Sequence, residues 1–301
     1  MALRNRNRIK QSTPDRLFSC FVFLFLTLSL ILVAYPLLFV FSASFSDSSA
    51  VMSGKVYIWP VKPTLIAYKT VMKYKSIIVG FRNSVIYMAS GTLLTIIFTI
   101  LAAYPLSRRE FWGRDAFSFI FAFTMYVAGG IVPTYILISN LKMLDTIWAM
   151  IIPGTVNVWH IIMCRTFIQT SISGELFEAA EIDGCSDFGI MVRIVVPLST
   201  PILAVLCLYT AVGIWNGYFN AMIYLSSQSK YPLQIALRSI LMLGQISMTA
   251  FDDVEAAAQA QALAALLKYA VIVVATVPMM LIYPFVQKFF VKGAMIGAVK
   301  G

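Results

Sequence analysis

The chain has 301 residues, of which 60% are hydrophobic and only 12% are charged. That apolar content exceeds what a soluble core of this length can bury, so it excludes an ordinary soluble domain and predicts an all-α polytopic membrane protein. The net charge of +10 comes from dispersed Lys and Arg with no basic stripe interleaved with aromatic residues, which disfavours nucleic-acid binding.

Six apolar stretches are long enough to cross a bilayer, which takes about 20 helical residues. They cover residues 17–41, 84–104, 116–138, 147–167, 201–225 and 263–285. Because the number of spans is even, both termini lie on the same side of the membrane. Gly and Pro residues interrupt several of these stretches, and we expect them to kink helices for packing.

A basic segment precedes the first span. The apolar run that follows has about 25 residues, longer than the core of a cleavable signal peptide, so we expect a retained signal anchor. Positive residues favour the cytoplasmic side of a membrane, and the short loops place further arginines on the same side. The sequence therefore predicts that both termini are cytoplasmic. The cations concerned are Arg4, Arg6, Arg8, Lys10 and Arg16, with Arg108, Arg109 and Arg114 in a short loop and Arg165 and Arg193 assigned to the polar segment after the fourth span.

Four parts follow from this layout. Residues 1–41 form the cytoplasmic N-terminus and first span, and residues 42–83 form an extracytoplasmic segment with a predicted surface helix at 65–75. Residues 84–285 form a five-helix core, and residues 286–301 form a cytoplasmic tail rich in Gly and Lys.

A polar island at about 174–197 separates the fourth and fifth spans. It reads Glu178-Ala179-Ala180-Glu181-Ile182-Asp183-Gly184, followed by Ile194 and Pro197. Gly tolerates the left-handed backbone that ends many helices, so this order predicts a first helix, a turn at Gly184 and a second helix from about Ser186.

The spacing resembles the EAA loop of ABC importer permeases, although Val196-Pro197 stands where that family usually has Leu-Pro. The resemblance extends over nearly the whole chain and implies the type I importer permease fold in a bacterial cell membrane. It also implies that the island forms coupling helices seated in a cleft of a cytoplasmic ATPase. The alternative is a cytosolic loop with a fortuitous Glu-Ala-Ala. The implied coupling residues are Glu178, Ala179, Ala180, Asp183, Gly184, Ile194 and Pro197.

The C-terminal segment 290–301 is similar to the ending of carbohydrate-uptake permeases of the maltose-permease type. The likeness implies that Gly297, Lys300 and Gly301 contact the ATPase; a frayed terminus kept soluble by lysines is the alternative. The basic, Ser-rich start and Pro133-Thr134-Tyr135 give a softer likeness to the LplC/YtcP-like branch, whose members handle complex polysaccharides and uronide oligosaccharides.

A sugar crossing a membrane needs aromatic faces for its C–H surfaces and amides for its hydroxyls. Candidates of both kinds lie in the fifth span, with a weaker one in the fourth, and interhelical packing is the alternative role for each. On one continuous helix they would spread around the circumference, so not all would face one cavity. The candidates are Trp215, Asn216, Tyr218, Asn220 and Asn157.

Several chemistries are excluded by what the sequence lacks. His160 is the single histidine, the four cysteines are isolated, and no phosphate-binding G-x-x-x-x-G-K-[ST] loop occurs. We therefore expect no enzyme activity, no metal site and no cofactor on this chain, with ATP and Mg²⁺ bound by a partner ATPase.

The resulting hypothesis is a permease subunit of an ATP-driven importer for an oligosaccharide. Its expected partners are a second permease, two ATPase subunits, an extracytoplasmic solute-binding lipoprotein and membrane lipid. An ATP-independent secondary carrier or channel is the alternative, although it leaves the polar island unexplained.

Overall fold

The computed structural model describes residues 12–246, 266–282 and 284, and within that part the chain is helical, with no strand. The chain divides into two compact units: the first contains Met1–Thr70 and Gly244–Val273, and the second contains Val71–Leu243 and Val274–Gly301. The all-helical prediction is confirmed for the described residues.

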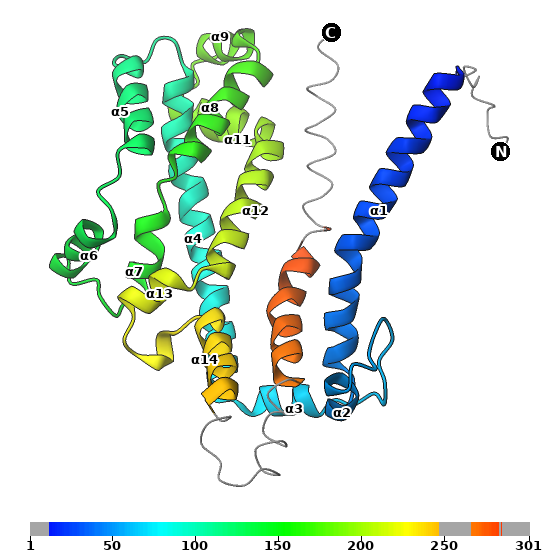
Figure 1. The fold of residues 1–301 in the computed structure, drawn as a ribbon. Helices are drawn as coiled ribbons and strands as arrows, with labels where there is room; N and C mark the ends of the chain where they lie inside the picture. The colour runs from blue at the N-terminus through cyan, green and yellow to red at the C-terminus, as the bar shows by residue number, and fades with distance from the viewer. Residues whose placement is uncertain (1–11, 247–265, 283, 285–301) are drawn as a thin grey trace. The chain divides into compact units, whose positions relative to one another are not determined.

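The first unit contains the long helix α1, Thr13–Ser44, and the short helix α2, Ser48–Met52 (Figure 1). The α1 helix begins with a capping box in which the side chains and backbones of Ser12 and Asp15 satisfy each other's free groups. A small core around Ala43, Ala50 and Val56 packs α2 and the following loop onto the end of α1. Helix α3, Ile66–Lys73, confirms that the stretch 65–75 contains a helix, and its place at the membrane surface stays a prediction.

Helix α4, Lys75–Ser107, is the central helix of the second unit and packs against α8, Val158–Ser171, and α12, Thr200–Asn216 (Figure 1). A Cβ placed on Gly91 would come within 2.7 Å of the Ile214 side chain, so this glycine lets α12 approach closely. The helix begins at Lys75, before the predicted span 84–104, and the predicted boundary of the core at residue 84 stays a prediction.

Three predicted spans are broken rather than continuous. Residues 116–138 form α5, Arg114–Tyr126, and α6, Ile131–Asn140, which meet at 113°. The bend lies at Gly129-Gly130, where Gly130 has φ of +84°, a backbone conformation that favours glycine.

The fourth and fifth spans break at Pro and Gly. Helix α7, Trp148–Ile151, and a 3₁₀ turn at Ile152–Gly154 precede α8, with a 46° bend near Pro153. Helix α12 ends at Asn216, and α13, Phe219–Tyr224, begins after Gly217. The expectation that Gly and Pro residues kink the helices is therefore confirmed at Gly129-Gly130 and near Pro153.

Two of the described helices, α1 and α4, are long and apolar enough to cross a membrane on their own. The number rises to five if each bent pair is one span, and the helix Leu266–Ile282 is apolar but shorter. The described residues therefore support a membrane protein, and the total of six spans stays a prediction.

Side chains in the first half of α4 form hydrogen bonds with the segment that leads into α14, Leu233–Ile246. The Asn83 Nδ2 group donates to the backbone carbonyls of Ser229 at 2.8 Å and Tyr231 at 3.1 Å. The backbone N–H of Leu233 donates to Ser84 Oγ at 2.9 Å. Asn83 and Ser84 are buried, so the segment is fixed by polar contacts away from solvent.

Replacing Asn83 with leucine is expected to destabilise the protein by about 1–3 kcal/mol, because two carbonyls lose their donor away from water. Thermal unfolding of the purified protein in detergent measures the effect. Ser90→Ala is the matched control, since Ser90 is only half-buried and its hydroxyl donates within its own helix, to the Ile86 carbonyl. Equal melting of the two variants would show that Asn83 does not fix the segment.

Candidate functional site

The polar island folds as two short helices joined by a tight turn. Helix α9, Gly174–Ile182, ends in a pattern in which Gly184 N–H bonds to Glu181 and Cys185 N–H bonds to Ala180. This is the Schellman arrangement, which requires a left-handed residue, and Gly184 has φ of +73°. Helix α10, Asp187–Ile190, follows, with the Ser186 side chain accepting from Gly189 N–H at its start. The predicted helix, turn and helix are confirmed.

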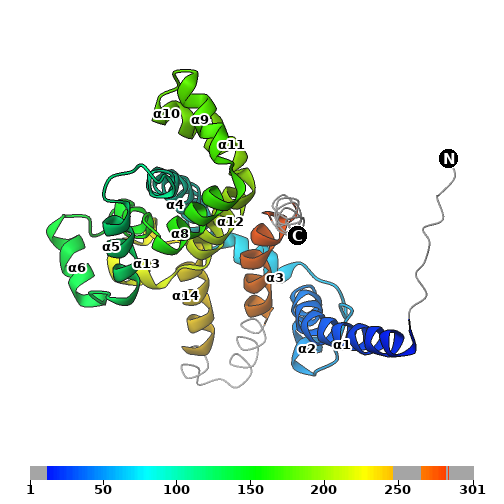
Figure 2. The same ribbon diagram turned by 90° about the horizontal axis from the view of Figure 1, so that it is seen from above.

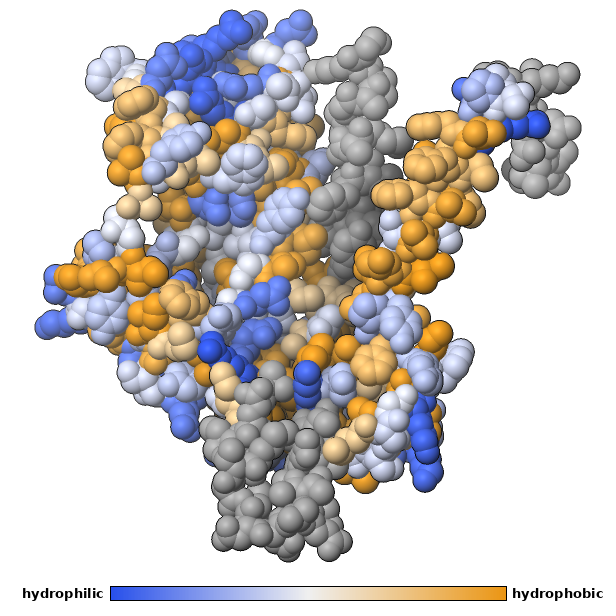
Figure 3. Space-filling model, viewed as in Figure 1, coloured by the Kyte–Doolittle hydropathy of each residue, from blue (hydrophilic) through white to orange (hydrophobic). Residues whose placement is uncertain are grey.

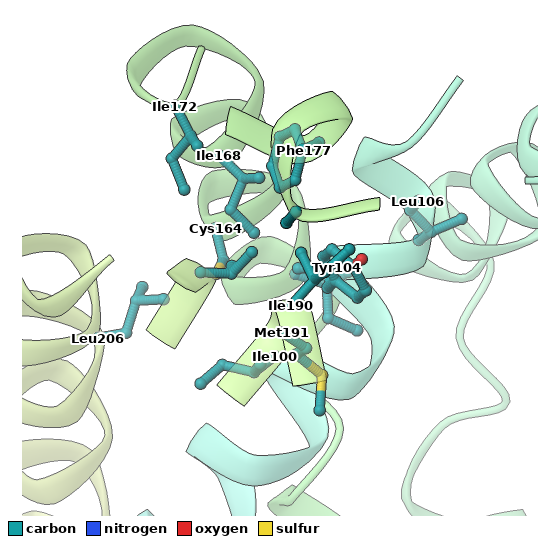
Figure 4. Close-up of a cluster of buried hydrophobic side chains, with 14 residues drawn as sticks. Ile100, Tyr104, Leu106, Cys164, Ile168, Ile172, Phe177, Ile190, Met191 and Leu206 are labelled. Atoms are coloured by element: carbon teal, nitrogen blue, oxygen red, sulfur yellow. The ribbon is translucent and has the colours of Figure 1, made fainter. Parts of the chain in front are cut away.

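One face of α9 belongs to the core of the second unit. Phe177 and Ala180 are 8% and 7% exposed and lie in a cluster with residues of α4, α8, α10 and α12. Figure 4 shows Phe177 near Ile168 and Ile172 of this cluster. Ala180 therefore packs within its own chain, whereas the sequence placed it with Ala179 at the predicted contact with the ATPase.

The opposite face of α9 is open. Glu178, Ala179 and Ile182 are exposed, and Ile182 is 86% exposed although it is apolar. Asp183 and Gly184 continue this surface into the turn. Seen from above, α9 and α10 project beyond the group formed by α4, α8 and α12 (Figure 2). This face of α9 is therefore accessible to another molecule.

The chain after α10 contains an unusual turn. Residues Met191–Val195 form a π-helix, and Pro197 follows in the short helix α11, Val196–Leu198. Proline has no N–H to donate to the preceding turn, which favours such an irregularity. Of the two predicted site residues here, Ile194 is half-buried against the core and Pro197 is exposed. The island thus brings Glu178, Ala179, Asp183, Gly184 and Pro197 to the surface.

A charged cavity of about 1000 Å³ lies beside α9, lined by residues of α4, α8 and α9, by the loop after α4 and by the first residue of α5. Hydrophilic residues gather at this end of the second unit (Figure 3). Its wall includes four arginines and three glutamates: Arg108, Arg109, Arg114 and Arg165, with Glu110, Glu178 and Glu181. The wall is close to charge balance, which does not favour an anion site.

Sequence reasoning missed Arg108 as part of the site. It pairs with Glu181 of α9 and with Glu110 at 3.4 Å, and its guanidinium lies 4.6 Å from the centre of the Phe177 ring. The only signal in the sequence was an arginine pair at the end of a span. Its partner in α9 lies 73 residues away, so no local pattern identifies the contact.

The candidate solute residues do not share one surface. Trp215 is 1% exposed and its Nε1–H donates to the Ala275 carbonyl at 3.0 Å, so it is a packing residue in this conformation. Asn216, Tyr218 and Asn220 are exposed and lie around the break between α12 and α13. The expected single helix through these residues is therefore wrong, because the chain is extended at Gly217.

Two further sets complete the predicted site residues. Asn157 is the cap of α8, where its side chain accepts from His160 N–H at 3.2 Å. Gly297, Lys300 and Gly301 lie outside the described residues. A solute path and a tail contact stay predictions.

A polar junction also joins two loops of the second unit. Asp145, with φ of +54°, accepts from the backbone N–H groups of Ser226 and Ser227, both at 3.0 Å, and from Lys230 Nζ at 2.8 Å. The hydrogen bond from Lys230 is the main cause that holds the pKa of Asp145 well below its usual value.

Replacing Asp145 with asparagine is expected to lower the melting temperature at pH 7. Asparagine tolerates the same backbone conformation but lacks the negative charge. Folding lowers the pKa of the Asp145 carboxyl. Its contribution to the free energy of unfolding is therefore fully present above the unfolded pKa of about 4 and is lost as the pH falls from there toward the folded pKa. Melting curves of both proteins from pH 7 to pH 3 should therefore converge in acid. A constant difference over that range would contradict the charge-based explanation.

Comparisons with known proteins give consistent results, although no family model matches the chain. The protein LplC of Bacillus subtilis is 38% identical over 266 residues, which cover 88% of this chain and 89% of LplC. The polygalacturonan/rhamnogalacturonan transport system permease protein YtcP of the same organism is 38% identical over 291 residues, or 95% and 99% of the two chains.

A solved structure shares the fold. It is the crystal structure of a bacterial ABC transporter involved in the import of the acidic polysaccharide alginate. The superposition gives a TM-score of 0.83 at 32% sequence identity and covers 94% of this chain and 100% of that chain.

Proposed function

Because this chain belongs to the family of ABC transporter permeases, we propose that it forms half of the path of an ATP-driven importer for an oligosaccharide. Permeases are the non-catalytic membrane components of such transporters, so the chain works in a complex with other ABC components. The relatives named for polygalacturonan, rhamnogalacturonan and alginate support a solute derived from an acidic polysaccharide.

The observation that carries the proposal is the open face of α9. A buried face with Phe177 and Ala180 anchors the helix, while Glu178, Ala179 and Ile182 face outward. We infer that this outer face and the turn at Gly184 enter a cleft of the partner ATPase. Glu178 then supplies a polar contact and Ala179 a close one. ATP-driven closure of the ATPase pulls two such loops together and changes the access of the path.

The membrane arrangement is part of the same proposal. Six spans, with both termini in the cytoplasm of a bacterial cell, place the α9–α10 island on the side of the ATPase. Residues 42–83 face outward, where the solute-binding lipoprotein delivers its cargo, and residues 84–285 form the core. A second, different permease completes the path, and Gly297, Lys300 and Gly301 touch the ATPase. This chain itself binds no cofactor, and ATP with Mg²⁺ is held by the two ATPase subunits.

Affinity purification of the tagged chain from native membranes tests the assembly. An ATPase, a second permease and a solute-binding lipoprotein are expected in the eluate under mild detergent, identified by mass spectrometry. The ligand carried by the lipoprotein then defines the solute. A correctly folded chain that is recovered alone would contradict the importer.

Uptake assays decide between an importer and an ATP-independent carrier. With the purified complex in proteoliposomes, uptake is expected to require ATP on the side of the membrane that corresponds to the cytoplasm. It is also expected to require the solute-loaded lipoprotein on the opposite side. Uptake that continues without ATP but stops when the ion gradient is collapsed would favour the carrier.

A further inference from the structure

Besides the apolar packing between them, the end of α4 and α9 are connected by a charged side chain, Arg108. Arg108 follows the last residue of α4, and its backbone N–H bonds to the Pro105 carbonyl within the final turn. Its side chain is only 16% exposed. Since α4 packs against both α8 and α12, Arg108 lies at the end of the helix to which the other two are fastened.

Arg108 makes two different contacts with α9. Its Nη2 donates to Glu181 Oε1, and its guanidinium lies over the Phe177 ring at 4.6 Å. Phe177 and Glu181 are four residues apart and therefore occupy the same side of the helix. The planar guanidinium suits this combination, because it can stack on an aromatic face while its edge donates to a carboxylate.

A second carboxylate contacts the same guanidinium without joining the two helices. Glu110 lies 3.4 Å from Arg108 Nε, and its side chain is 73% exposed. Glu110 is two residues from Arg108 in the same loop, so losing this contact leaves α4 and α9 as connected as before. Glu110 and Glu181 both pair with Arg108, but only Glu181 belongs to α9. Comparing variants of the two glutamates therefore tests the connection to α9 apart from the loss of a charge.

We propose that Arg108 is a positioning residue that transmits displacement of α9 to α4 through Glu181 and Phe177. This inference rests on the proposed function, in which the ATPase moves α9. The outer face of α9 stays free for the ATPase, since Arg108 contacts the helix on the side of Phe177 and Glu181. Glu181 is half exposed, and a pair of this kind adds little to the stability of the fold. The apolar contacts of Phe177 and Ala180 keep α9 in place without it. Loss of the pair therefore affects transmission more than folding.

The test compares Glu181→Gln with Glu110→Gln in the complete transporter in proteoliposomes. ATP hydrolysis and solute uptake are measured together, and their ratio is the readout. Glu181→Gln is expected to lower the amount of solute taken up per ATP at least fivefold, with the ATPase still bound. Glu110→Gln is expected to leave the ratio unchanged. Equal ratios in both variants and in the wild type would overturn the inference.

Charge exchange gives a second, independent arm. Arg108→Glu and Glu181→Arg are each expected to lower the ratio, and the double variant is expected to regain most of it, because the opposite charges again face each other. Failure of the double variant to recover, at normal abundance and with the ATPase bound, would also overturn the role of Arg108. If the wild-type complex shows no ATP-driven uptake, the proposed function itself fails. If the wild type takes up solute but the variants keep its ratio of solute to ATP, only the inference about Arg108 fails.

Discussion

Replacing Gly184 with aspartate is expected to reduce solute uptake to background while the protein stays in the membrane at normal abundance. Gly184 has φ of +73°, and nothing lies within 4 Å of the position a Cβ would take. The cost within the chain is therefore backbone strain alone, about 1–2 kcal/mol, and aspartate is among the residues that tolerate this conformation best. The new carboxylate would instead stand on the exposed turn that we propose enters the ATPase.

Uptake of labelled solute and the amount of ATPase that copurifies with the variant measure this effect. Gly174→Asp is the matched control. Gly174 also has open space around it and is exposed, but it lies in the first turn of α9, where a negative charge is favourable. Normal uptake by the Gly184 variant at equal abundance would rule out a coupling role for the turn.

Replacing Trp215 with alanine is expected to destabilise the protein by about 3–5 kcal/mol, the usual cost of emptying the space of a buried aromatic side chain. Trp215 is 1% exposed, its ring lies 5.6 Å from that of Phe81 in an edge-to-face arrangement, and its N–H is bonded to Ala275. The alanine variant would lose both contacts and would leave the buried space of the ring empty. Abundance in the membrane and melting in detergent measure the loss.

Two further variants separate packing from solute binding at Trp215. Trp215→Phe should retain much of the packing and recover part of the stability. Trp159→Ala should have little effect on stability, because Trp159 is 57% exposed. If Trp215 were instead a sugar contact, the alanine variant would fold normally and take up solute with a raised KM.

The island could be predicted from the sequence because its signals are local. Gly184 alone supplies the backbone freedom that ends α9, and Ser186 caps the helix that follows. The alternation of exposed and buried residues along α9 also follows from helical periodicity once the neighbouring apolar spans are recognised. The family likeness rests on these same residues.

The sequence predicted that Gly and Pro residues interrupt the spans, but not how sharply the chain bends at each of them. Hydropathy over a window of about 19 residues is insensitive to backbone direction, so it joins α5 to α6 and α12 to α13 in single stretches. The contact of Arg108 with Glu181 and that of Asp145 with Lys230 connect residues 73 and 85 positions apart. Such pairings depend on tertiary packing, which a single sequence does not reveal.

The turn after α9 also gives the chain a built-in chemical probe. Cys185 is half-buried in the turn next to Gly184, whereas Cys164 is fully buried and Cys20 and Cys207 lie in apolar helices predicted to be in lipid. A water-soluble maleimide reacts with thiolates that water can reach, so Cys185 should be labelled first. Its labelling rate in native membranes should fall when the ATPase is docked and rise when it is stripped away. The natural protein would then report its own engagement, without an engineered cysteine.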